Sequence, residues 1–264
     1  MIFEWWRARR RRQLLAQPIP ETWERYLSSN CRHLAQLRPA EIARLRDDVR
    51  LLIAEKHWEG CNGLEVTDEM RVTIAAHAAI MGLGFPTAPF DRLMSILIYP
   101  NTFVANPRRR QPWGLEEDAA EPRLGEAWYQ GPVILSWRQV LQQCVEQPDG
   151  RNLVIHEFAH LLDMANFDVD GVPDLPREVN ARQWADVFHE EFRRLQRQIR
   201  LGRSTLLDEY AGTSPVEFFA VGSEAFFERP TALRAENPQV YDLLRQYYRQ
   251  DPAAREPKPA DGNL

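Results

Sequence analysis

The sequence predicts a single α+β domain that is mainly helical and contains a small mixed sheet. Most of the chain places apolar residues at the 3.6-residue spacing of helices, and only two short apolar runs bounded by glycine and proline are typical of buried strands. The composition, with 44% hydrophobic and 27% charged residues among 264, is that of an ordinary globular protein. A disordered or fibrous protein is therefore not expected.

The expected elements follow one another as helices, two strands, and helices again. Helices are predicted over 39–58 and 68–84, because their apolar residues share one face and glycines end the second. Strands are predicted over 91–100 and 131–137, joined by a turn-rich segment that we expect to form an active-site loop or a hairpin. Further helical patterns cover 138–147, 151–165, 178–200, 215–228 and 238–250.

The two ends of the chain differ from its body. Residues 1–20 carry a run of arginines beside two tryptophans, which predicts a solvated basic tail or short helix; contact with an acidic partner or a membrane surface is the alternative. Residues 253–264 are polar and rich in proline, as flexible termini often are. The single domain is therefore expected to span 21–252, with a helical N-terminal part.

Charge, hydropathy and cysteine usage exclude several classes of function. The net charge of -5 gives no reason to expect direct nucleic-acid binding, and no apolar run approaches the ~18 residues of a membrane span. Cys31, Cys61 and Cys144 are widely spaced, so neither a disulfide framework nor a cysteine metal site is predicted. The apolar stretch after the basic start is too short for a signal peptide, and we expect a cytoplasmic location.

The segment RNLVIHEFAHLLDMA contains the motif H-E-x-x-H at His156, Glu157 and His160. Two histidines four residues apart lie about 40° apart on one helical face, where a tetrahedral Zn²⁺ can take both nitrogens. Glu157 projects beside that face and can act as general base on a water that zinc activates. An ordinary helix with two histidines is the alternative, but zinc hydrolase chemistry is the preferred interpretation.

A catalytic zinc requires a third protein ligand, and the neighbouring residues exclude one class of peptidase. The metzincin motif would place glycine and histidine where this chain has Asp163 and Asn166. His189 is a possible ligand, but it lies on a highly charged helical pattern and is expected to face solvent. Asp163 suits the support of a histidine or helix capping better than direct ligation.

Glu217 is the preferred third ligand. It falls in the first turn of an otherwise apolar helix opened by Ser214 and Pro215, where a buried carboxylate is costly without a cation. Glu224, seven residues later, shares its face and is assigned a supporting role beside the ligands. A favourable interaction with the helix dipole, or an ion pair, is the alternative for either carboxylate.

Several segments together resemble the Mlc titration factor A family of zinc metallopeptidases. They are HEFAHLLDMAN, GVPDLPREV, YAGTSPVEFFAVGSEAFFE, LIYPNTFVAN and GEAWYQGPVILSW, within residues 20–250. The resemblance implies a zincin-type, gluzincin-like fold related in its catalytic core to anthrax lethal factor. It implies one zinc ion held by His156, His160 and Glu217, with Glu157 as general base. Tyr210, unremarkable on sequence alone, matches a tyrosine that faces the metal and can hydrogen-bond the developing oxyanion.

Two functions from different classes follow. The first is a zinc-dependent peptidase, whose peptide or protein substrate we expect to pair along the strand GPVILSW. The second is a non-catalytic protein that sequesters a transcription factor, since the resemblance implies a repressor of the Mlc type as a partner. The glutamate between the two histidines favours the enzyme, because a scaffold has no need of it. The sequence does not distinguish an aminopeptidase from an endopeptidase.

Overall fold

The computed structural model describes residues 2–101, 131–145, 149–166 and 168–255. Helices outnumber strands throughout this part of the chain, which confirms the mainly helical prediction with a small sheet. In chain order the elements are α1 (Ile2–Leu15), α2 (Glu21–Asn30), η1 (Arg32–Gln36), α3 (Pro39–Glu55), β1 (His57–Gly60), α4 (Asp68–Gly82), β2 (Ser95–Tyr99), β3 (Val133–Ser136), α5 (Trp137–Val145), α6 (Leu153–Asp163), η3 (Met164–Asn166), α7 (Ala181–Arg200), η4 (Glu209–Gly212), α8 (Pro215–Glu228), α9 (Pro230–Glu236), α10 (Pro238–Tyr248) and η5 (Pro252–Ala254).

The described sheet has three strands in the order β1-β2-β3, and both pairs are parallel. The predicted mixed sheet is therefore wrong for these strands. The reason is the connection between β1 and β2, which runs through α4 and returns the chain in its original direction. The helix predicted over 39–58 stops at Glu55, and the residues expected to form its end belong to the start of β1. The segment predicted to be a loop or hairpin, at 102–130, lies outside the described residues.

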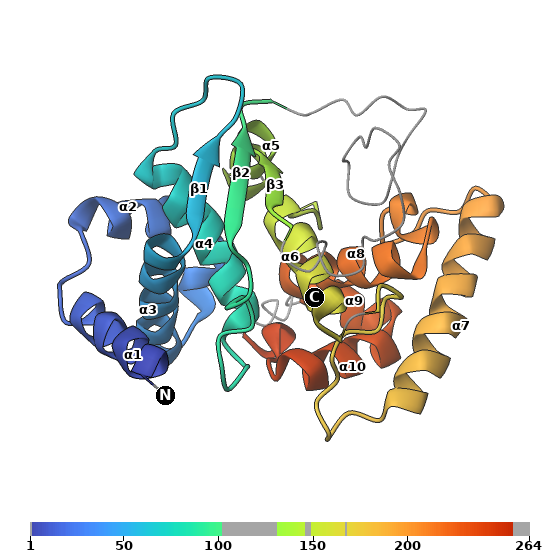
Figure 1. Cartoon of the computed structure of the whole chain (residues 1–264). Helices are drawn as coiled ribbons and strands as arrows, with labels where there is room; N and C mark the ends of the chain where they lie inside the picture. The colour runs from blue at the N-terminus through green and yellow to red at the C-terminus, as the bar shows by residue number, and fades with distance from the viewer. Residues whose placement is uncertain (1, 102–130, 146–148, 167, 256–264) are drawn as a thin grey trace, which may run out of the picture.

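The basic start of the chain forms α1, which packs on α3 (Figure 1). Arg11 lies 2.6 Å from a carboxylate oxygen of Glu55 and 2.8 Å from Asp91, and Arg7 lies near the same two acids. Burial of Glu55 is partial, and hydrogen bonds from Arg11 lower the pKa of this carboxyl to about 2. Part of the positive charge of residues 1–20 is thus neutralised within the molecule. The boundary of the domain at residue 21 stays a prediction.

The helix α6 occupies the middle of the molecule (Figure 1). It packs against α4 and β3 on the side of the N-terminal half and against α8 on the side of the C-terminal half. Both neighbouring helices are largely buried, and α8 buries every residue from Val216 to Glu228. A helix buried all round must satisfy each of its polar side chains within the protein. The three glutamates of α8 therefore need partners, and α6 lies where it can supply them.

No helix among the described residues is long and apolar enough to cross a membrane. The helix predicted over 215–228 has the predicted bounds as α8, the other predicted helices are present in shorter form, and α2 and α9 were not predicted. Residues 256–264 of the expected C-terminal tail lie outside the described residues.

Candidate metal centre

The helix α6 holds both histidines of the H-E-x-x-H motif. Asn152 caps its first turn, because the side-chain oxygen accepts a hydrogen bond from the backbone N–H of Ile155 at 3.2 Å. Apolar side chains bury two sides of the helix, and His156 and His160 share the face that meets α8. Sequence reasoning placed the helix start near Asp149 and missed Asn152, although an asparagine directly before an apolar helical run is a common capping signal.

The helix α8 brings Glu217 to the same place. Ser214 caps its first turn by accepting a hydrogen bond from the backbone N–H of Glu217 at 3.2 Å, and Pro215 occupies the first helical position. Only 3% of Glu217 is exposed. The local sequence thus places a carboxylate in the first buried turn of α8.

Three ligand atoms converge between α6 and α8. The Nε2 atoms of His156 and His160 lie 3.1 Å apart, and Oε2 of Glu217 lies 3.1 Å from the first and 3.6 Å from the second. Ligands at ~2.0–2.1 Å from a tetrahedral zinc lie about 3.3 Å from one another. Glu217 Oε2 is buried and receives no well-directed hydrogen bond from the described residues. We name these three residues the metal cluster, because their spacing fits a bound cation.

Glu224 holds the other side of the His156 ring. Its Oε1 lies 2.8 Å from Nδ1 of His156, and its Oε2 accepts a hydrogen bond from the backbone N–H of Asn152 at 2.5 Å. When Nδ1 donates to a carboxylate, the lone pair of Nε2 is directed at the metal cluster, as is usual for metal-ligating histidines. The supporting position predicted for Glu224 agrees with this arrangement, and Glu217 is the carboxylate that joins both histidines.

The electrostatics of the metal cluster also favour a cation. Burial opposes protonation of His156, but the close carboxylates of Glu217 and Glu224 outweigh it and raise the pKa of this histidine to about 10. In the metal-free chain a proton on His156 therefore offsets the negative charge of the surrounding carboxylates. A divalent cation can replace that proton and carry the same role with more charge.

The two residues predicted to act on the substrate lie at the metal cluster. Burial raises the pKa of Glu157 to about 7, so this carboxyl can both take up and release a proton near neutral pH. Tyr210, in η4, donates a hydrogen bond from its hydroxyl to Oε1 of Glu217 at 3.1 Å. Its ring centroid lies 6.1 Å from that of His156. The sequence-predicted set is thus brought together from three separate segments.

The other residues considered as ligands lie elsewhere. His189 is exposed on α7 and belongs to no group of metal-binding side chains among the described residues. Asp163 is fully buried, and its Oδ2 accepts a hydrogen bond from the backbone N–H of Gly171 at 3.1 Å. Gly171 has a φ of +82°, and a Cβ there would lie 2.4 Å from the carbonyl oxygen of Pro215. Asp163 therefore ties the segment after α6 to the start of α8.

Known proteins resemble this chain over nearly its whole length. The model of a family described as glucose-regulated metallo-peptidase M90 matches residues 3–249. An uncharacterized protein of Synechocystis sp. is 35% identical over 94% of this chain and 90% of its own length. Mlc titration factor A of Serratia proteamaculans is 35% identical over 77% of the chain and 78% of its own length, and that of Yersinia pestis is 32% identical over 96% and 92%. The resemblance predicted from the motifs is thereby confirmed.

Proposed function

Since the chain belongs to the glucose-regulated metallo-peptidase M90 family, we propose that it is a zinc-dependent peptidase whose metal is held by the metal cluster. One observation carries this proposal: two imidazole nitrogens and a buried carboxylate oxygen lie 3.1 to 3.6 Å apart. Two nitrogens and one oxygen are a donor set that zinc accepts in catalytic sites.

The residues around the metal cluster can perform peptide hydrolysis. A zinc ion bound there would supply a Lewis acid that polarises the scissile carbonyl and lowers the pKa of a water molecule. Glu157 takes the proton of the attacking water and passes it to the leaving amine. The Tyr210 hydroxyl donates a hydrogen bond to the oxyanion as it forms, and so stabilises the transition state more than the bound substrate.

An extended peptide is the substrate class that the surroundings favour. The strand β3 packs against α6 and, in the described part of the sheet, pairs on one side only, with β2. Backbone groups on its second edge can bind a substrate strand by main-chain hydrogen bonds, as extended peptides commonly bind. This arrangement would present a peptide bond beside the motif helix.

The test combines metal analysis with a peptide library. The purified chain should carry one zinc per molecule and cleave members of an unbiased library. Glu157→Gln should retain the zinc and the fold while cleavage falls by about 10²–10⁴-fold, the usual contribution of a general base. Undiminished cleavage by this variant would remove Glu157 from the reaction. Absence of cleavage by the zinc-loaded parent would favour the second candidate.

The second candidate is binding of a transcriptional repressor, in addition to or in place of catalysis. It is supported by relatives that carry the name Mlc titration factor A at 32–35% identity. Binding should persist in Glu157→Gln, because a surface contact does not need the general base. We also propose a cytoplasmic site of action, which agrees with the lack of a disulfide among Cys31, Cys61 and Cys144.

A further inference from the structure

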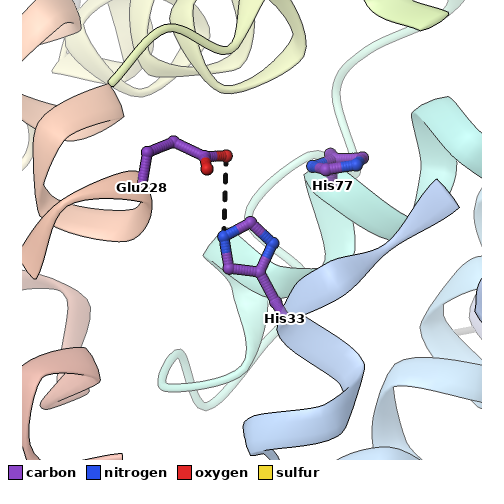
Figure 2. Close-up of side chains that lie close together, drawn as sticks. All are labelled: His33, His77 and Glu228. Atoms are coloured by element: carbon purple, nitrogen blue, oxygen red, sulfur yellow. Dashed lines mark ion pairs between the residues drawn. The ribbon is translucent and has the colours of Figure 1, made fainter. Parts of the chain in front are cut away.

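A second group of two histidines and a glutamate lies buried between the two halves of the molecule. His33 of η1, His77 of α4 and Glu228 at the end of α8 approach one another from three elements (Figure 2). All three are at least nine-tenths buried. We name them the polar cluster. Its composition equals that of the metal cluster, so the first question is whether it too is built for a cation.

The ring of His77 is already hydrogen-bonded through both nitrogens. Its Nε2 lies 3.0 Å from the carbonyl oxygen of Asn30, which can only accept, so this nitrogen carries the proton. Its Nδ1 consequently accepts, and the amide Nδ2 of Asn152 lies 2.9 Å away to donate. Burial lowers the pKa of His77 to about 4, which keeps the ring neutral in this arrangement.

Glu228 is likewise supplied with donors from the protein. Its Oε1 accepts a hydrogen bond from Nδ2 of Asn152 at 2.6 Å, and its Oε2 accepts from the guanidinium of Arg32. The Nε2 atom of His33 lies 3.5 Å from Oε1 and 3.2 Å from the carbonyl oxygen of Phe227. A metal ion here would have to displace the Asn152 amide and oppose the Arg32 charge. The polar cluster is therefore a hydrogen-bonded group rather than a second metal centre.

Asn152 connects this group to the metal cluster. It caps α6 four residues before His156, and its backbone N–H donates to Oε2 of Glu224, whose Oε1 holds Nδ1 of His156. A continuous set of contacts thus runs from Arg32 through Glu228, Asn152 and Glu224 to a proposed metal ligand. Two carboxylates of α8 hold one residue at the start of α6, which sets the rotation of α6 about its own axis.

We infer that Asn152 and Glu228 are positioning residues, which hold α6 so that His156 and His160 face Glu217 of α8 before a metal arrives. This inference rests on the proposed metal site but not on peptidase activity. Partners of ligating histidines outside the coordination shell commonly contribute about 10–100-fold to metal affinity. Here that contribution comes from a contact one step further away, which joins α6 to α8 and, through Arg32 and His77, to the N-terminal half.

The test is zinc affinity, measured on the full chain by competition with a chelator. Asn152→Ser keeps a good helix cap but removes the Nδ2 donor, and Glu228→Gln removes the charge that pairs with Arg32. Both should bind zinc about 10-fold more weakly or worse. In the cobalt-loaded protein, both should also shift the visible absorption bands. The matched control is Tyr248→Phe in α10, which removes a buried 2.9 Å hydrogen bond to Ser223 of α8, the helix that carries Glu228. It should lower thermal stability and leave zinc affinity unchanged.

Three results would overturn the inference. Affinity within about threefold of the parent in both variants would show that the polar cluster only adds stability. An equal loss of affinity in Tyr248→Phe would show that any weakening of α8 has this effect. Two zinc ions per parent chain, with one lost in His77→Gln, would make the polar cluster a second metal centre. Failure of the proposed function would give a different result. In that case the parent chain would bind no zinc, or would bind zinc that His160→Ala does not remove.

Discussion

The metal cluster and the polar cluster contain the same side chains and yet differ in what fills the space between them. In the metal cluster, two Nε2 atoms and Oε2 of Glu217 lie 3.1 to 3.6 Å apart, and this oxygen accepts no hydrogen bond of good geometry from the described residues. In the polar cluster, the Asn152 amide donates hydrogen bonds to His77 and Glu228, and the Arg32 guanidinium donates one to Glu228. A set of two histidines and a glutamate therefore indicates a metal site only when the protein supplies no competing hydrogen-bond donors.

The largest expected difference between the clusters is zinc stoichiometry. His160→Ala should abolish stoichiometric zinc binding, because the remaining His156 and Glu217 leave too few ligands. His77→Gln should retain one zinc per chain. Metal content measured by mass spectrometry after gel filtration checks both. One zinc per chain retained in His160→Ala would show that the metal cluster is not the zinc site.

Tyr210 provides the next largest effect, since its hydroxyl reaches Glu217 of the metal cluster. Tyr210→Phe should lower kcat and kcat/KM alike, by about 10²–10³-fold. Zinc content should hardly change, although the 3.1 Å bond to Glu217 is lost. Steady-state kinetics on one good peptide, with Tyr248→Phe as control, make the measurement. A change below threefold would leave Tyr210 a structural residue.

Glu224 should show a smaller effect that separates support from ligation. Glu224→Gln keeps the shape of the side chain but weakens its bond to Nδ1 of His156, so zinc affinity should fall by about 10–100-fold. Glu217→Gln should reduce affinity further, because it removes a ligand. Chelator competition on the two variants in parallel gives the ratio. If Glu224→Gln proves the more damaging, the two carboxylates have been assigned in the wrong order.

The smallest expected effect concerns acid stability of the metal-free protein. The pKa of His77 is lowered to about 4 in the folded chain from its ordinary 6.5, because burial disfavours the charged ring. The unfolded chain therefore binds the proton first, and stability is lost as pH falls from 6.5 toward 4. Over that window His77 should account for up to roughly 3 kcal/mol of the decline. Urea unfolding at pH 7 and pH 4.5 should show a shallower decline in His77→Gln, and an identical decline would contradict the burial of a neutral ring.

The metal cluster could be predicted from sequence because its signals are local. The motif histidines share a face by helical spacing, and Glu217 stands out as a charge in an apolar turn. The polar cluster could not be predicted. Its members come from η1, α4 and α8, and each taken alone resembles an ordinary core or surface residue. Asn152, which links the two clusters, was missed although its capping signal was present.

The same distinction between local and distant signals explains the errors in the fold. The helices with strong periodicity were found, whereas β1 was not, because HWEG is short and half-exposed and becomes a strand only by pairing with β2. The apolar residues of α3, directly before β1, follow a helical pattern up to the start of this strand. The parallel direction of β1 and β2 also depends on α4 as the crossover between them, and the sequence of either strand alone does not indicate it.

Three glutamates on one face of α8 limit where insertions and deletions can occur in related sequences. Residues seven and four positions apart stay in phase on a helix, so Glu217, Glu224 and Glu228 all point toward α6. A single inserted residue between the first two would turn one of them by about 100° away from its partner. We therefore expect insertions and deletions among related chains to fall outside α8. The pattern E-x₆-E-x₃-E after a Ser-Pro cap should then serve to recognise distant members whose H-E-x-x-H motif alone is ambiguous.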